Sequence, residues 1–175
     1  MPPIRHRAAV LTVSDLGSRG ERVDTAGPAV ASLLAGAGFE VVEQVLLPDE
    51  LEQIAALLRR WADEGEIALA VTTGGTGLAP RDRTPEATRA VLDYRVPGME
   101  EAMRAASVAV VPTAMLSRAV CGVRGRTLIV NLPGSERGAR ENLTILLPVL
   151  DHACSSLRGD AEESAGTHGR IQGQL

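Results

Sequence analysis

A run of glycines and threonines is the clearest chemical signal in this sequence. Thr72-Thr73-Gly74-Gly75-Thr76-Gly77 ends a short apolar segment. Glycines after a buried strand let successive backbone N–H groups approach an anion without interference from Cβ atoms. We interpret Gly74, Gly75, Thr76 and Gly77 as a phosphate cradle, although a plain tight turn can have the same sequence. The run lacks the lysine of a Walker A loop and the third glycine of a Rossmann fingerprint.

Two aspartates could supply oxygen ligands beside this cradle. Arg81-Asp82-Arg83 follows it directly and places a carboxylate between two cations. Such a carboxylate suits Mg²⁺ held against a triphosphate, and a turn with a solvated ion pair is the alternative. Asp49 ends another apolar run. It either shares the metal with Asp82 or merely caps a helix that begins at Glu50.

Further polar clusters also follow apolar runs. Ser14-Asp15 and Asn131-Leu132-Pro133-Gly134-Ser135 are suited to hydrogen-bonding a heterocycle or a ribose, and either could be only a turn. A basic series in an otherwise acidic chain hints at an anionic ligand, although a surface role accounts for most of its members. The series comprises Arg118, Arg124, Arg126, Arg137 and Arg140.

The composition excludes several kinds of catalysis. All 18 basic residues are arginine, so the chain has no lysine for a Schiff base, a P-loop or a lysyl-AMP intermediate. The 3 histidines and 2 cysteines show neither zinc-ligand spacing nor a hydrolytic triad. Phosphoryl or nucleotidyl transfer needs none of these groups, because an ionised phosphate can itself attack.

Length and charge limit the class of protein. The 175 residues, 45% of them apolar, have room for one domain with a sizeable core. A net charge of −4 argues against nucleic-acid binding. No apolar stretch approaches the roughly 20 residues of a membrane span and no signal-peptide core is present, so we expect a cytoplasmic protein that binds no membrane. The composition predicts one domain over residues 1–157 and a disordered tail over residues 158–175.

The elements that must position the polar clusters follow from the hydrophobic pattern. Short apolar runs predict buried strands at Ala8–Val13, Val41–Leu47, Ile67–Thr72 and Thr127–Leu132. Helices between strands imply right-handed crossovers and a three-layer α/β/α sandwich with a mostly parallel sheet. Ligands of such sheets bind at the carboxyl ends of the strands. We therefore expect Ser14–Asp24, Pro48–Glu50 and Thr73–Thr84 to face one crevice.

Helical spacing and capping residues predict the connecting helices. One begins at Asp24 or Thr25 with Pro28 in its first turn, and the next runs from Leu51 to a C-cap at Gly65. A short helix capped by Thr84 runs through Asp93, and another starts near Pro97. The last helix follows Ser135 and should kink at Pro148.

Taken in order, the motifs resemble the molybdopterin-binding family, which includes bacterial molybdopterin adenylyltransferases and the G domain of gephyrin. The resemblance covers residues 5–157. It is carried by Thr12–Asp15, Asp24–Pro28, Thr72–Gly77, Arg81–Ala87, Pro97–Glu100, Leu116–Arg118 and Leu132–Ser135.

This resemblance implies a molybdopterin-binding-domain-like fold that assembles as a homotrimer. It also implies an enzyme, a nucleotidyltransferase of molybdenum-cofactor biosynthesis that transfers AMP from ATP to the molybdopterin phosphate and releases pyrophosphate. ATP and molybdopterin would be its substrates, Mg²⁺ its cofactor, and a molybdenum-insertion protein a partner. Asp49 and Asp82 would be the catalytic and metal-binding carboxylates, and Gly74, Gly75, Thr76 and Gly77 would bind phosphate. Ser14, Asp15, Ser117, Arg118, Pro133, Gly134 and Ser135 would line the pterin and nucleotide pockets.

Other functions within the same resemblance stay open. A pterin-binding or carrier paralogue would lack transferase activity, and a nucleotide hydrolase would resemble competence-damage proteins. A gephyrin-like scaffold would require linker and insertase segments. The Leu132–Ser135 ending, followed by Gly138–Asn142, resembles the adenylyltransferase branch more closely, because relatives often carry proline where Ser135 stands.

Overall fold

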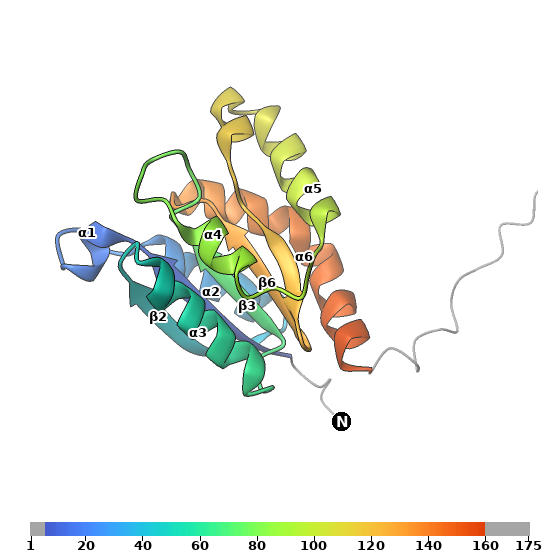
Figure 1. The fold of residues 1–175 in the computed structure, drawn as a ribbon. Helices are drawn as coiled ribbons and strands as arrows, with labels where there is room; N and C mark the ends of the chain where they lie inside the picture. The colour runs from blue at the N-terminus through green and yellow to red at the C-terminus, as the bar shows by residue number, and fades with distance from the viewer. Residues whose placement is uncertain (1–5, 160–175) are drawn as a thin grey trace, which may run out of the picture.

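One sheet organises the structure, a computed structural model that describes residues 6–159 (Figure 1). Its strand order is β2-β1-β3-β6-β5-β4. The strands are β1 (Arg7–Val13), β2 (Glu40–Leu47), β3 (Leu69–Thr73), β4 (Tyr94–Arg95), β5 (Cys121–Arg124) and β6 (Thr127–Leu132). The pairs β2–β1, β1–β3 and β3–β6 are parallel, which confirms the mostly parallel sheet.

The antiparallel edge formed by β5 and β4 was not predicted from the sequence. β4 has only 2 residues and both are exposed, so it carries no hydrophobic pattern. β5 is joined to β6 by a tight turn in which Gly125 has a φ of +56°. Such short strands form because their neighbours provide hydrogen-bonding partners, and a pattern read along the chain does not reveal this.

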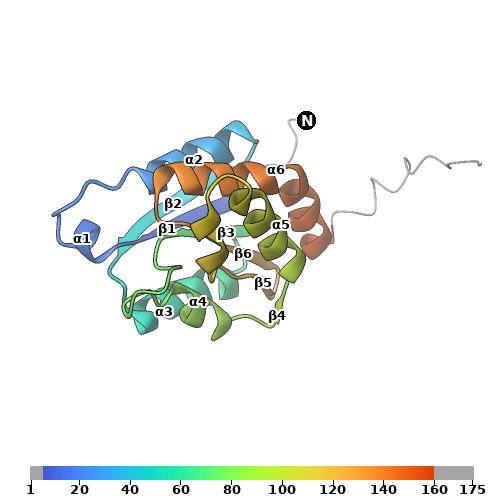
Figure 2. The ribbon, with the colours of Figure 1, turned by 90° about the horizontal axis from the view of Figure 1, so that it is seen from above.

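Helices cover both faces of the sheet and form the predicted three layers (Figure 2). On one face, α2 (Ala26–Gly36), α5 (Pro97–Val108) and α6 (Glu136–Arg158) pack against the sheet through residues such as Leu34, Met103 and Leu143. On the other face, α3 (Leu51–Asp63) and α4 (Thr84–Arg89) contribute Leu58, Trp61 and Ala87. The central strands are therefore buried on both sides, as their unbroken apolar runs predicted.

Several predicted helix ends need correction. The loop predicted after β1 contains a short helix, α1 (Asp15–Ser18), whose N-cap Ser14 accepts a hydrogen bond from the Gly17 N–H group at 3.0 Å. α4 ends at Arg89 rather than Asp93, and Arg83 rather than Thr84 is its N-cap. Thr84 is fully buried instead. A 3₁₀ helix, η1 (Pro112–Leu116), follows α5 and was not predicted.

The last helix continues through Pro148 to Arg158 and ends at Gly159, which is in the left-handed conformation. Its end lies one residue beyond the predicted domain boundary at residue 157. Residues 160–175, where most of the disordered tail is predicted, lie outside the described part of the chain. Of the helices within residues 6–159, none has the length and hydrophobicity needed to cross a bilayer.

Candidate active site

A cleft of about 440 Å³ lies at the carboxyl ends of the parallel strands. Its walls are formed by the segments that follow β1, β2, β3 and β6, because parallel strands deliver their following loops to one edge. This confirms the expected crevice. The predicted site residues that line it are Ser14, Asp15, Asp49, Gly74, Gly75, Asp82, Gly134 and Ser135.

A second cleft, of about 340 Å³, adjoins the first. The predicted residues Thr76, Gly77, Ser117, Pro133 and Ser135 line it, and Ser135 lines both clefts. Its remaining wall includes Arg104, Ser107, Thr113, Arg137 and Asn142, of which sequence reasoning had connected only Arg137, as a member of the basic series, with an anionic ligand. These residues come from α5, η1 and α6 and form no local motif. Only the folded chain brings them together.

Steric constraints explain the first two glycines of the loop after β3. Gly74 has a φ of +103°, and a Cβ atom there would lie 2.2 Å from the Val13 carbonyl oxygen. Gly75 has a φ of +65°, and its Cβ atom would lie 2.4 Å from Thr84 Oγ1. Both positions therefore require glycine for backbone reasons alone. The tight-turn interpretation holds for this pair, but it does not describe the rest of the loop.

The same loop leaves a row of backbone donors unused. The Gly74 N–H group donates to the Leu132 carbonyl oxygen at 3.2 Å. The N–H groups of Gly75, Thr76 and Gly77 have no acceptor among residues 6–159. Two of their carbonyl oxygens are held by the backbone, since that of Gly75 accepts from the Thr84 N–H group and that of Thr76 from the Arg118 N–H group. Unpaired successive N–H groups are the donors expected of an anion site.

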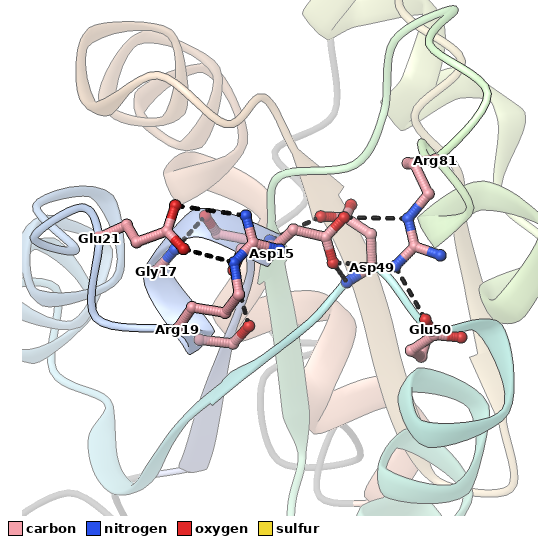
Figure 3. A network of polar contacts seen from close by, with 9 residues as sticks. Asp15, Gly17, Arg19, Glu21, Asp49, Glu50 and Arg81 are labelled. Carbon is pink, nitrogen blue, oxygen red and sulfur yellow. Dashed lines mark hydrogen bonds and ion pairs between the residues drawn. The ribbon is translucent and has the colours of Figure 1, made fainter.

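Asp15 and Asp49 join the ends of β1 and β2 (Figure 3). The Asp15 N–H group donates to Asp49 Oδ2 at 2.9 Å, and the Asp49 N–H group donates to Asp15 Oδ1 at 3.0 Å. Asp49 therefore does not cap α3, whose N-cap is Glu50. Arg81 donates to both carboxylate oxygens of Asp15 at 2.9 Å, and this contact holds the pKa of Asp15 below its usual value. The ionised carboxylate of Asp15 thus holds the Asp49 backbone and the Arg81 side chain together.

Asp49 differs from Asp15 in its electrostatic environment. Burial raises the pKa of Asp49, and the nearby charges of Asp15 and Asp82 add to the increase. A carboxylate whose ionised form is disfavoured in this way gains from a bound cation. The Oδ1 atoms of Asp49 and Asp82 accept no hydrogen bond from residues 6–159, whereas Oδ2 of Asp82 accepts from the Ala79 N–H group at 3.0 Å.

These two carboxylates fit a magnesium ion shared with a substrate. Mg²⁺ prefers oxygen ligands and is commonly held by one or two carboxylates together with substrate phosphates and water. Asp49 and Asp82 both line the cleft, and each keeps one oxygen free of hydrogen bonds from residues 6–159. Within residues 6–159 no group of three or more histidine, cysteine, aspartate or glutamate side chains is positioned to hold a metal. The remaining ligands would therefore come from phosphate and water.

The contacts of two arginines differ from those expected from the sequence. Arg81 pairs with Asp15 and Glu50 rather than with its neighbour Asp82. Arg118 lines neither cleft. Its guanidinium group donates to the carbonyl oxygens of Gly77 and Asp82, at 2.8 Å and 2.7 Å, and pairs with Glu86. Arg118 thus stabilises the loop that contains Gly77 and Asp82. Its direct contact with a substrate stays a prediction.

Asn131, in the predicted ligand-binding cluster after β6, is also used internally. Its side chain is fully buried and donates to the hydroxyl groups of Thr72 and Thr88, both at 2.9 Å. Its Oδ1 atom accepts from the Val120 N–H group at 3.1 Å. With both ends of the amide occupied, Asn131 fixes β6 against its neighbours, and only Pro133, Gly134 and Ser135 of this cluster reach the clefts.

Comparison with known proteins identifies the family to which this chain belongs. A family model described as a probable molybdopterin binding domain matches residues 9–152, which is most of the chain. The chain belongs to the molybdopterin-binding family. Its site therefore lies at the strand ends of a molybdopterin-binding domain.

Individual members of the family show the extent of the similarity. Molybdopterin adenylyltransferase of Helicobacter pylori strain J99 is 39% identical over 153 residues, which cover 86% of this chain and 87% of that protein. The molybdenum cofactor synthesis protein cinnamon of Drosophila melanogaster is 39% identical over 166 residues, a match that covers 94% of this chain but only 28% of that longer protein. The crystal structure of the molybdopterin biosynthesis enzyme MoaB from Thermus thermophilus superposes with a TM-score of 0.83 at 57% identity, covering 88% of this chain and 97% of that one.

Proposed function

We propose that this chain is a molybdopterin adenylyltransferase of molybdenum-cofactor biosynthesis. It transfers the AMP unit of ATP to the phosphate of molybdopterin and releases pyrophosphate. The observation that carries the proposal is the row of N–H groups at Gly75, Thr76 and Gly77, which have no acceptor in the described part of the chain, together with two cleft carboxylates that each have one oxygen without a donor there. The similarity to the Helicobacter pylori adenylyltransferase over most of both chains supports it.

Two substrates require two binding spaces that meet where the reaction takes place. The two clefts share Ser135, and the glycine loop contributes Gly74 and Gly75 to one cleft and Thr76 and Gly77 to the other. Ser135 is also the N-cap of α6, a helix of 23 residues. The positive end of the α6 dipole therefore lies where anionic groups of both substrates would meet.

The reaction itself needs no general base. The ionised phosphate of molybdopterin attacks the α-phosphorus of ATP, a phosphorus–oxygen bond forms, and the bond to the bridging oxygen breaks. Pyrophosphate leaves with the electron pair, so no proton must move. The chain binds and orients both phosphates, and the free N–H groups of the loop stabilise the charge on their oxygens. This agrees with a sequence that has no lysine and only 3 histidines.

Mg²⁺ is the cofactor that we propose, with Asp49 and Asp82 as its protein ligands. When bound, Mg²⁺ neutralises phosphate charge and polarises the phosphorus–oxygen bonds. The raised pKa of Asp49, which results first from burial, supports this role because a cation would relieve the cost of its charge.

We also propose that the chain forms a homotrimer and acts in the cytoplasm, where ATP is available. Support for association comes from an uncharged stretch, residues 105–116. Val110, Val111, Met115 and Leu116 within it are all exposed. Exposed apolar side chains that cluster in this way are typical of protein interfaces. A molybdenum-insertion protein is the proposed recipient of the product.

A pyrophosphate-release assay separates this function from its alternatives. Purified protein is incubated with Mg²⁺ and ATP, with and without molybdopterin. Pyrophosphate that forms only when molybdopterin is present supports the transferase. Saturable molybdopterin binding without pyrophosphate would indicate a carrier, and ATP breakdown without molybdopterin would indicate a hydrolase.

A further inference from the structure

The larger cleft has an unusual charge for a site that accepts a triphosphate. Four aspartates line it, namely Asp15, Asp24, Asp49 and Asp82. Arg22 is the one cationic side chain among the described residues of its lining. Carboxylates repel a polyanion, so a triphosphate needs compensating charge here beyond the neutral N–H groups of the glycine loop.

Three other arginines near the cleft, Arg19, Arg81 and Arg118, are already paired. Arg19 pairs with Glu21 at 2.7 Å, and Arg81 bridges Asp15 and Glu50 (Figure 3). Arg118 is held by Glu86 and by backbone carbonyl groups. Arg22, in contrast, makes no ion pair and no side-chain hydrogen bond with any of residues 6–159. Its guanidinium group is therefore available to a ligand.

The backbone on both sides of Arg22 is anchored. Before it, the Glu21 N–H group donates to the Leu16 carbonyl oxygen at 2.9 Å. After it, the Asp24 carboxylate accepts from Thr12 Oγ1 at 2.6 Å and from the Gly27 N–H group at 2.9 Å. Only Arg22 and Val23 lie between these anchors, and both line the cleft. The short bridge thus holds the backbone of Arg22 at the cleft wall, so that its side chain lines the cleft.

We propose that Arg22 is a further substrate-binding residue that contacts the triphosphate of ATP through its pyrophosphate portion. This inference rests on the proposed function, because it assigns ATP to this cleft. The guanidinium group donates hydrogen bonds in a planar fork that matches phosphate oxygens. Arg22 then supplies positive charge that the four aspartates and the glycine loop lack.

The test is calorimetric binding of Mg²⁺-pyrophosphate, Mg²⁺-ATP and adenosine to the full chain. Arg22→Gln should weaken binding of pyrophosphate and of ATP by about fivefold, as expected for one solvent-accessible ionic contact. Adenosine binding should not change, because adenosine carries no phosphate. Arg22→Lys should recover part of the loss, and the loss should shrink as salt concentration rises.

Arg19→Gln is the matched control, because it removes the same charge from the same loop at a position outside the cleft lining. It should leave pyrophosphate and ATP binding unchanged. Wild-type affinity in Arg22→Gln, an equal loss in Arg19→Gln, or no pyrophosphate binding by the wild-type protein would overturn the inference. If Arg22→Gln loses pyrophosphate affinity while the wild-type protein makes no adenylyl-molybdopterin, the proposed function is refuted and the role of Arg22 is retained.

Discussion

Asp49 and Asp82 line the same cleft from loops 33 positions apart in the chain, and each has one carboxylate oxygen that accepts no hydrogen bond from residues 6–159. Each also has a structural bond through its other oxygen, to the Asp15 N–H group and to the Ala79 N–H group. An asparagine can keep the structural bond with its carbonyl oxygen while losing the charge. This separates the chemical role of each carboxylate from its role in the fold.

Accordingly, Asp49→Asn and Asp82→Asn should each lower kcat for adenylyl transfer by about 100-fold or more, a loss typical of removing one transition-state contact. Thermal unfolding should show that both variants stay folded. Asp63→Asn, which removes a carboxylate paired with Arg124 and outside the cleft lining, should retain activity. Near-normal turnover in either active-site variant would refute its catalytic role.

How far the sequence predicts individual residues depends on the range of the interactions involved. The sequence predicts that Asp49, Asp82 and the glycine loop lie close together. They follow strands, and parallel strands share one ligand-binding edge. The partner of Arg81 could not be predicted, since its contact with Asp15 joins residues 66 positions apart. Likewise, nothing along the chain shows that the side chains of Arg118 and Asn131 form their hydrogen bonds with other parts of the protein.

At the scale of elements, the approach of the β3 end to the β1 end depends on Gly74. Gly74→Ala should cost about 3 kcal/mol or more in unfolding free energy, because it combines a left-handed backbone with a Cβ atom 2.2 Å from the Val13 carbonyl oxygen. Gly20→Ala is the control, with a φ of +73° and no atom within 4 Å of the added Cβ. It should cost about 1 kcal/mol. Equal costs in urea denaturation would contradict the close approach.

Glu100 links α5 to the antiparallel edge of the sheet. Its carboxylate is 1% exposed, pairs with Arg95 and accepts from the Cys121 N–H group at 3.0 Å. Burial alone would raise the pKa of Glu100, but the Arg95 hydrogen bond and the Cys121 N–H group outweigh it and lower the pKa. The pair therefore stabilises the fold above the usual pKa of a glutamate, and this stabilisation is lost as pH falls through the lowered pKa.

Glu100→Gln should consequently lower the unfolding free energy by about 2 kcal/mol at pH 7, since the uncharged amide loses the ionic hydrogen bonds. The difference from wild type should shrink as pH falls below the usual glutamate pKa. Chemical denaturation from about pH 7 down to about pH 3 measures it. A difference that stays constant with pH would show that Glu100 has the same pKa in the folded and the unfolded chain, which would contradict the stabilising ion pair.

Elements with a strong hydrophobic pattern were predictable, and those made by context were not. The four parallel strands and the main helices follow from apolar runs and helical stripes, within a few residues of the observed ends. α1, η1, β4 and β5 are between 2 and 5 residues long, too short for either periodicity to appear. They are set instead by capping, tight turns and hydrogen bonding to neighbouring strands.

For the whole molecule, the exposed apolar side chains of residues 105–116 predict self-association. Met115 is 61% exposed and Val110 is 62% exposed, in a stretch with no charged residue. Sedimentation equilibrium should give three times the chain mass for the wild-type protein. Met115→Glu should give a smaller species, because a buried charge at the interface is costly. Arg59→Glu, a change at an exposed position of α3, should leave the trimer intact. A wild-type monomer would contradict this part of the proposal.

The most direct test of the central claim follows the α-phosphate of ATP. Wild-type protein, Mg²⁺ and molybdopterin are mixed with ATP labelled at the α-phosphorus, and the pterin product is isolated. The account predicts that the label moves to molybdopterin with one pyrophosphate released per labelled product, and that Asp82→Asn nearly abolishes the transfer. Saturated molybdopterin binding with no label on the pterin would contradict it.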